Sequence, residues 1–258
     1  CCSAPLPRVR LLLPATCYCD DYDRTAEHFC VGVGKAIHTL AVADGFRKNV
    51  CINSVRRTRA HDRLIELVAL LDEQRGEETF VVDAVGAGAL SEWPWAVHHP
   101  DEARGAFAAF KAHAALAIEL VRAVACSFGS GTKELTVAVW IMETLERAAM
   151  AVGFRGLLQP AHLRRLFVVA LVLATKLVQE RIVNTGQLCD RLAECGVFPC
   201  IDTGSMLRLE FKVMDVLGWR VPFDQNGAQF TCYADALLDL ADDHSGAPRS
   251  ARLRLFDD

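Results

Sequence analysis

An apolar stretch with a polar end constrains the fold of this chain more than any other feature of its sequence. Every residue from Leu166 to Ala174 is apolar, and Thr175 and Lys176 follow directly. The stretch is too long for a typical β-strand of about 5–6 residues and far shorter than the roughly 20 apolar residues of a membrane-spanning helix. The sequence therefore predicts a helix that other helices enclose.

Helical patterns follow one another through the second half of the chain. Alanine-rich or amphipathic segments are separated by glycine, proline and capping residues, and no strand-like alternation appears after residue 100. We expect Gly129 to end one helix, Thr132 to cap the next and Pro160 to begin the apolar one. Asn184 or Thr185 is expected to cap the following helix, and Thr203 or Ser205 the one after it. The expected helices lie within 101–129, 133–152, 161–180, 186–195, 206–219 and 228–243, so the predicted fold class is all-α.

The first hundred residues show a weaker pattern. Only residues 61–74 carry a clear helical period, with Leu64, Leu67, Val68 and Leu71 on one face. We expect residues 1–100 to form a poorly defined, partly disordered extension, in which the basic segment 54–64 is a solvated loop. Residues 241–258 are expected to form a mobile tail.

The segment "GVGK" at residues 32–35 invites comparison with a phosphate-binding loop. That motif needs a glycine five residues before its Gly-Lys pair and a serine or threonine after it. Phe29 and Ala36 occupy those places. The sequence therefore excludes this nucleotide site.

Composition narrows the class of partner. The net charge of −4 and the pI near 6.1 lack the basic footprint of most nucleic-acid-binding proteins, so no nucleic acid is expected as a partner. None of the eleven cysteines forms a C-x-x-C pair, so we expect reduced thiols and no metal site or other cofactor. We therefore expect an intracellular protein, cytoplasmic or nuclear, without a membrane partner.

Two charged residues interrupt apolar helix faces. Lys176 shares its face with Val169, Val172 and Leu173, and Glu210 shares its face with Met206, Val213 and Leu217. Taken singly, Lys176 suits a helix C-terminus and Glu210 suits the edge of an amphipathic helix. Together, an acid and a base in apolar surroundings indicate polar anchors within a hydrophobic docking face.

The same segments carry a resemblance to a known family. "FVVALVLATKLVQERIVN", followed by "LRLEFKVMDVLGWRV", resembles the third to fifth helices of a cyclin box, in the single-box phosphate-regulatory branch related to the plant P- and U-types. Arg165 matches the arginine that opens the third helix in this branch. The resemblance covers about residues 112–240 and implies a five-helix cyclin box with flanking helices within residues 101–240. The matching positions are Ala170, Ala174, Thr175, Lys176, Asn184, Leu209, Glu210, Leu217 and Trp219.

The resemblance implies a function in docking rather than in catalysis. A cyclin is a regulatory subunit that binds and activates a cyclin-dependent protein kinase, in a process such as cell-cycle progression or a nutrient response, and has no catalytic residues of its own. By resemblance, Lys176 and Glu210 bond the kinase. The apolar residues expected around them, on the docking face or in the core beneath it, are Val172, Leu173, Leu177, Phe211 and Met214.

The chain departs from the family pattern in its second helix. The family usually has "Y-(I/L)-D-R" where this chain has "IMET", with Glu143 and Thr144 at the acidic and arginine positions. By resemblance, Glu143 is expected to pair with Arg122 on the first helix. The link "LAECGVFPCID" is also longer than usual.

Two alternatives remain open. The first is a cyclin-fold scaffold without kinase binding, acting in transcription or assembly, which the threonine at position 144 favours. The second is an enzyme with a cysteine nucleophile, with His98 or His99 as its base. Nothing in the sequence joins these histidines to a particular cysteine.

Overall fold

The described part of the protein is a bundle of helices. The computed structural model describes residues 24–46, 58–73, 114–154, 156–158, 160–179, 184–194, 202–220 and 228–242, and within these ranges all regular structure is helical. The helices are α1 (Arg24–Phe46), α2 (Arg59–Glu73), α5 (Ala114–Phe128), α6 (Thr132–Ala151), α7 (Pro160–Val178), α8 (Thr185–Glu194), α9 (Thr203–Val216) and α10 (Ala228–Asp242). The prediction of an all-α fold is confirmed for these residues.

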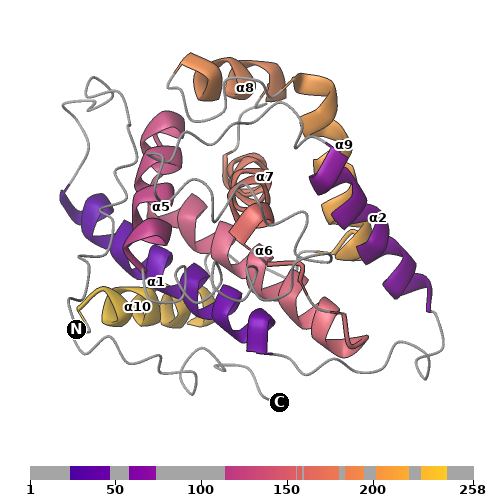
Figure 1. Ribbon diagram of the computed structural model, residues 1–258. Coiled ribbons are helices and arrows are strands. Elements are labelled where there is room, and N and C mark those ends of the chain that lie inside the picture. The colour runs from indigo at the N-terminus through magenta and orange to yellow at the C-terminus, as the bar shows by residue number, and fades with distance from the viewer. Residues whose placement is uncertain are drawn as a thin grey trace, which may run out of the picture.

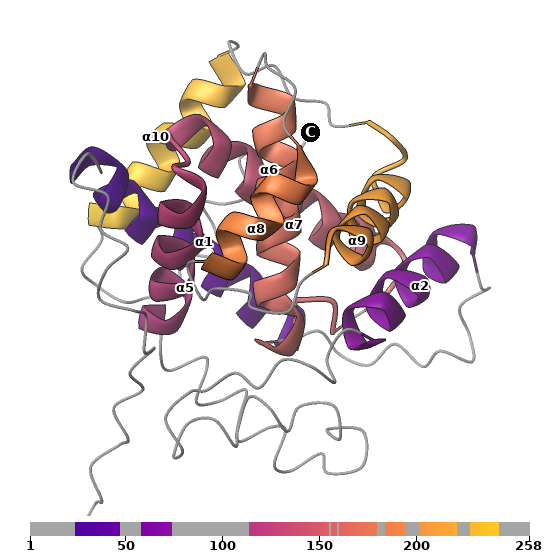
Figure 2. The ribbon, with the colours of Figure 1, turned by 90° about the horizontal axis from the view of Figure 1, so that it is seen from above.

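Helix α7 lies at the centre of the bundle. In Figures 1 and 2 it runs between α1, α5 and α10 on one side and α9 and α2 on the other, and it packs against α6, α9, α2 and α5. No residue from Leu166 to Ala174 is more than 7% exposed. The apolar run is therefore a helix enclosed by other helices, as its length and composition predict.

Most helices begin and end close to the glycine, proline and capping residues that were expected to bound them. Gly129 has a φ of 60° at the end of α5, and Pro160 is the first residue of α7. Helix α6 begins one residue earlier than expected, because Gly131 rather than Thr132 is the N-cap and Thr132 is the first helical residue. The Gly131 N–H donates to the Glu134 carboxylate over 3.1 Å, so an acidic side chain in the first turn satisfies an N–H that the helix cannot.

Polar side chains accept hydrogen bonds at the starts of α8 and α9. Asn184 precedes α8 and accepts a hydrogen bond from the Gly186 N–H over 2.8 Å. Helix α9 has Asp202 as its N-cap, which accepts from the Ser205 N–H over 2.9 Å. Hydrogen bonding by the Ser205 side chain and by its N–H lowers the pKa of the Asp202 carboxyl. The sequence expectation of Thr203 or Ser205 as this cap missed Asp202.

Part of the segment before residue 100 belongs to the same core. Helix α1 packs against α5, α10 and α6, and its residues Phe29, Val33 and Ile37 are at most 1% exposed. Helix α2 packs against α9, α7 and α6. Both helices lie before the expected boundary at residue 100. The basic segment 54–64, expected to be a solvated loop, is helical from Arg59 onward. Residues 54–57 of that segment and residues 243–258 of the expected C-terminal tail lie outside the described residues.

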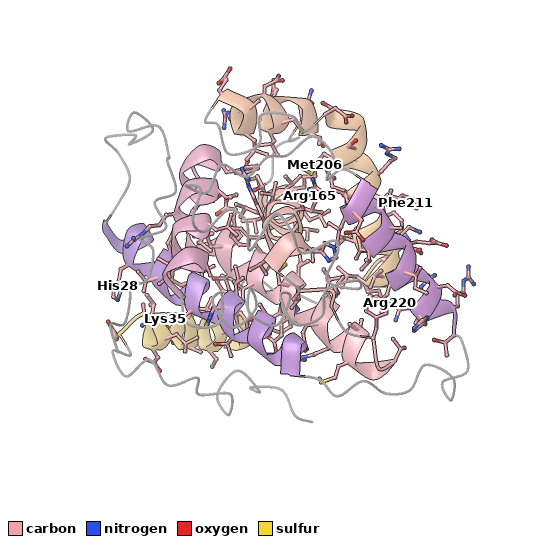
Figure 3. All side chains as sticks on the ribbon, viewed as in Figure 1. His28, Lys35, Arg165, Met206, Phe211 and Arg220 are labelled. Carbon is pink, nitrogen blue, oxygen red and sulfur yellow. The ribbon has the colours of Figure 1, made fainter. Side chains whose placement is uncertain are left out.

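The two glycines of the "GVGK" segment lie where other helices approach α1 closely. A Cβ at Gly32 would lie 1.8 Å from the Leu237 carbonyl oxygen of α10, and a Cβ at Gly34 would lie 2.5 Å from the Ile118 Cα of α5. Lys35 donates to the last-turn carbonyls of Leu240 and Ala241 over 2.8 and 3.1 Å. Figure 3 labels Lys35 on the side where α1 and α10 meet. The segment is therefore a close helix crossing, and its lysine caps α10.

No helix among the described residues combines the length and the hydropathy that crossing a bilayer requires.

Candidate docking site

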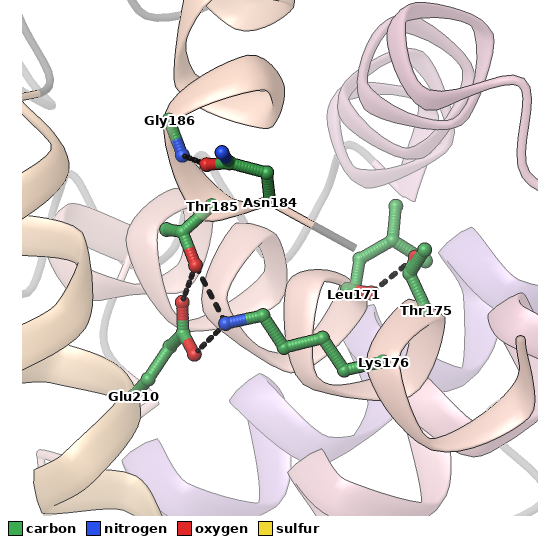
Figure 4. Close-up of polar contacts among 7 residues, drawn as sticks. All are labelled: Leu171, Thr175, Lys176, Asn184, Thr185, Gly186 and Glu210. Carbon is green, nitrogen blue, oxygen red and sulfur yellow. Dashed lines mark hydrogen bonds and ion pairs between the residues drawn. The ribbon is translucent and has the colours of Figure 1, made fainter. Parts of the chain in front are cut away.

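The side chains of Lys176 and Glu210 meet between α7 and α9. Lys176 lies in the last turn of α7, and its Nζ is 2.5 Å from Oε2 of Glu210 (Figure 4). The Glu210 side chain is 9% exposed and the Lys176 side chain 28% exposed. The structure thus brings together the two charges that the sequence places on apolar faces, and it exposes the cation more than the anion.

Thr185, at the start of α8, completes the contact. Its Oγ1 accepts from Lys176 Nζ over 2.6 Å and donates to Glu210 Oε1 over 3.2 Å. Thr185 is 6% exposed. Both carboxylate oxygens of Glu210 are therefore hydrogen-bonded, which offsets the cost of burying them. Sequence reasoning considered Thr185 only as a helix cap and missed this role.

The ammonium group of Lys176 retains donor capacity. A lysine ammonium has three N–H donors, and the contacts with Thr185 and Glu210 use two of them. Among the described residues no further contact uses the third, and the side chain is more than a quarter exposed. A molecule that approaches this point is best matched if it brings a hydrogen-bond acceptor, such as a carbonyl or carboxylate oxygen.

Helix geometry places an apolar strip beside the ion pair. Successive residues of an α-helix point about 100° apart. On α9, Glu210 points to α7 and α8, whereas Lys212 forms an ion pair with Glu66 of α2. Phe211 lies between these two directions and is 58% exposed. One turn earlier, Leu207 is 48% exposed, so two large apolar side chains lie next to each other on the outer face of α9.

Trp219 extends this strip. The Gly218 N–H donates to the Asp215 carbonyl over 3.1 Å and the Trp219 N–H donates to the Met214 carbonyl over 2.8 Å, the pattern of a Schellman motif. Trp219 itself has a φ of 59°, which is an outlier for a bulky residue. The Trp219 ring packs edge-on against the Phe211 ring, with a centroid distance of 5.0 Å. Trp219 is 55% exposed. A strained backbone thus displays an aromatic ring at the surface.

Charged contacts hold α2 against the other border of the strip. Lys212 pairs with Glu66 and lies 3.5 Å from Asp215, which in turn lies 3.2 Å from Arg63. The hydrogen bond that Lys212 donates to Glu66 is the main cause of the raised pKa of Lys212. The strip is therefore bordered by α7 and α8 on one side and by α2 on the other.

The five apolar residues expected around the anchors fall into two groups. Leu177 is 47% exposed and Phe211 is exposed, so both are available to a partner. Met214 is partly buried and packs against the core. Val172 and Leu173 are buried, at 0% and 7% exposure, and support the site from beneath. In this conformation they add no area to a docking surface.

Glu143, which is expected to pair with Arg122, contacts two other side chains. Glu143 accepts hydrogen bonds from Arg147 over 2.5 Å and from the Tyr233 hydroxyl over 2.8 Å. Tyr233 is on α10, outside the helix that the resemblance pointed to. The Thr144 hydroxyl donates to the Trp140 carbonyl of its own helix over 2.8 Å. The charge of Glu143 therefore joins α6 to α10 within the fold.

Two basic residues of α7 hold the end of α2. Arg165, which is 3% exposed, donates to the Leu71 carbonyl. Nε2 of His162 lies 2.9 Å from the Asp72 carboxylate, and its Nδ1 lies 3.2 Å from the Gly156 carbonyl oxygen. Arg165, matched through the resemblance, thus satisfies a carbonyl in the last turn of α2.

The sequence predicts no metal site, and a reactive thiol is required only by the enzyme alternative. The described residues contain no group of three or more His, Cys, Asp or Glu side chains placed to hold a metal ion. Burial is the main cause of the raised pKa of the Cys189 thiol, the opposite of what activates a nucleophile. His98 and His99 lie outside the described residues.

Comparison with known proteins identifies no relative: no family model, curated protein or solved structure matches this chain.

Proposed function

We propose that this chain is a cyclin-like regulatory subunit that binds and activates a cyclin-dependent protein kinase through α7 and α9. The observation that carries the proposal is the ion pair of Lys176 and Glu210 beside the exposed apolar face of α9. The resemblance to a cyclin box assigns kinase docking to the same two residues. The chain would act as a binding surface and transfer no group itself.

The proposed mechanism is a shift of population. A partner that binds the active conformation of a kinase more tightly than the inactive one increases the active fraction by that difference in affinity. In protein kinases the active conformation requires a particular position of a mobile regulatory helix. Here the third N–H of Lys176 would donate to an acceptor on that helix, while Leu177 and Phe211 would cover its apolar side chains.

A scaffold of the same fold without kinase binding is the second candidate. It is favoured by Thr144, whose hydroxyl bonds the carbonyl of its own helix at the place where the family has an arginine. Such a protein would use the exposed strip of α9 for a partner that is not a kinase. The two candidates differ in whether a kinase depends on Lys176 and Glu210.

The test is a charge exchange at the ion pair, K176E together with E210K. Because the two groups bond each other, the exchange retains an ion pair within the chain and reverses the charge shown to a partner. We expect the tagged natural chain to co-purify with a cyclin-dependent kinase, identified by its peptide masses, and the folded double variant to lose it. D239K, a charge reversal on the exposed face of α10, is the control and should retain the kinase. Absence of a kinase from the natural chain, or its retention by the double variant, would overturn the proposal.

A further inference from the structure

We propose that Thr185 is a positioning residue of this site: its hydroxyl fixes the geometry of Lys176 and Glu210, so that docking depends on the seating of the first turn of α8. The consequence for docking rests on the proposed function. The effect on the geometry of the ion pair does not.

The hydrogen bonds give the hydroxyl a fixed direction. A threonine hydroxyl has one hydrogen and two acceptor lone pairs. Since a carboxylate can only accept, the hydrogen of Thr185 points to Glu210 and its oxygen accepts from Lys176. Each of the three groups is thus bonded to the other two (Figure 4). Removing the hydroxyl would leave Oε1 of a nearly buried carboxylate without this donor.

The first turn of α8 is held firmly. Asn184 caps it through the Gly186 N–H. A Cβ at Gly186 would lie 3.1 Å from Asn184 Oδ1 and 3.5 Å from Thr203 Oγ1, so this turn lies directly against the start of α9. The inward side chains of α8 are buried, namely Thr185, Leu188, Cys189 and Leu192. A β-branched side chain also has few χ1 rotamers. The hydroxyl is therefore in place before any partner arrives.

This arrangement determines what a partner meets. Thr185 and Glu210 take two of the three N–H donors of Lys176, and the tetrahedral ammonium then directs the third along one line. Without Thr185 the ammonium would rotate about its single remaining acceptor, and a partner would have to pay the entropy of ordering it. The structure thus makes α8 a determinant of docking although it supplies no exposed apolar anchor.

The variants that test the inference form a matched set. T185V removes the hydroxyl and keeps the branched shape, T185A is the second such variant if T185V fails to fold, and T185S restores the hydroxyl. T175V is the control, since Thr175 is the immediate neighbour of Lys176 and is 4% exposed. Its hydroxyl donates to the Leu171 carbonyl of its own helix over 2.8 Å and takes no part in the ion pair.

The first measurement needs no kinase. A double-mutant cycle with K176M and E210Q in urea unfolding measures the coupling between the two charges. We expect a coupling of about threefold or more in the equilibrium constant for the natural chain, a smaller coupling with T185V or T185A because only Glu210 then orients the ammonium, and the natural value with T185S and T175V. An unchanged coupling with T185V or T185A would overturn the inference.

The second measurement is the affinity for the kinase found by co-purification. We expect T185V to weaken it by about tenfold, and T185S and T175V to change it by less than about twofold. A loss of coupling with unchanged affinity would overturn the docking part of the inference. If the natural chain binds no kinase, the proposed function fails, and the cycle alone decides whether Thr185 positions the pair.

Discussion

The hydroxyl of Tyr233 donates a hydrogen bond to Glu143 over 2.8 Å and joins α10 to α6 inside the core. Tyr233 is 1% exposed. Burial is the main cause of its pKa lying well above the usual range, and the negative charge of Glu143 raises it further. The contact ties the last described helix to the middle of the bundle, and it makes the fold sensitive to alkali.

We expect Tyr233 to reduce stability at alkaline pH. Its folded pKa is raised above the unfolded value of about 10, so its contribution is fully present below about pH 10 and is lost as the pH rises toward the folded pKa. Urea unfolding between pH 8 and 11 measures this loss. Y233F removes the ionisable group and should flatten the decline, at a cost of about 1 kcal/mol at pH 7 for the lost hydrogen bond. An equal decline in Y233F would contradict this expectation.

The crossing of α1 and α5 should not tolerate a side chain at Gly34. A Cβ there would meet the backbone of Ile118 at 2.5 and 2.8 Å, and backbone cannot rotate away. We expect G34A to lower the unfolding free energy by about 1–3 kcal/mol, measured by urea denaturation. G204A is the matched control, because its Cβ would meet only the Asp202 side chain, at 3.0 Å. Equal stability of the two variants would show that α1 does not cross α5 this closely.

Arg165 should hold the end of α2 in place. Its guanidinium donates to the Leu71 carbonyl from a buried position on α7. With R165M we expect faster hydrogen exchange over residues 59–73, because local opening of α2 becomes easier. Exchange in α1 and α10, which lie on the far side of the bundle, should stay the same and serves as the internal control. Unchanged protection of α2 would contradict the role of Arg165.

Trp219 should be dispensable for stability. A bulky residue at a φ of 59° carries backbone strain of about 1–3 kcal/mol, which glycine does not. W219G loses the exposed contact with Phe211 and relieves that strain, so we expect an unfolding free energy that is unchanged or higher by about 1 kcal/mol. The measurement is thermal or urea denaturation. A loss of more than about 1 kcal/mol would mean that the ring serves the fold rather than a partner.

The sequence predicts the features that depend on local pattern. The apolar run that ends at Ala174 predicts a central helix, and the interruptions at Lys176 and Glu210 predict anchors on apolar faces. Features that depend on contacts between residues far apart in the chain cannot be predicted from such a pattern. Nothing in the sequence shows that the start of α8 lies beside both charges, and so Thr185 was missed.

Helix α1 escaped prediction for a local reason. Gly32 and Gly34 lower the expected helix propensity, although they are required because two other helices approach at those points. The contact of Glu143 with Tyr233 joins residues far apart in the chain, where the resemblance offered only Arg122. Pairwise contacts of this kind follow from packing, which helical periodicity does not specify.

The most direct test of the central claim is the activity of a purified cyclin-dependent kinase mixed with this chain. We expect the natural chain to raise phosphoryl transfer to a peptide substrate by at least about tenfold, in line with a shift of about 1.4 kcal/mol or more toward the active conformation. The folded double variant K176E/E210K should give no increase. Equal activation by both proteins, or no activation by the natural chain of any kinase with which it co-purifies, would contradict the account.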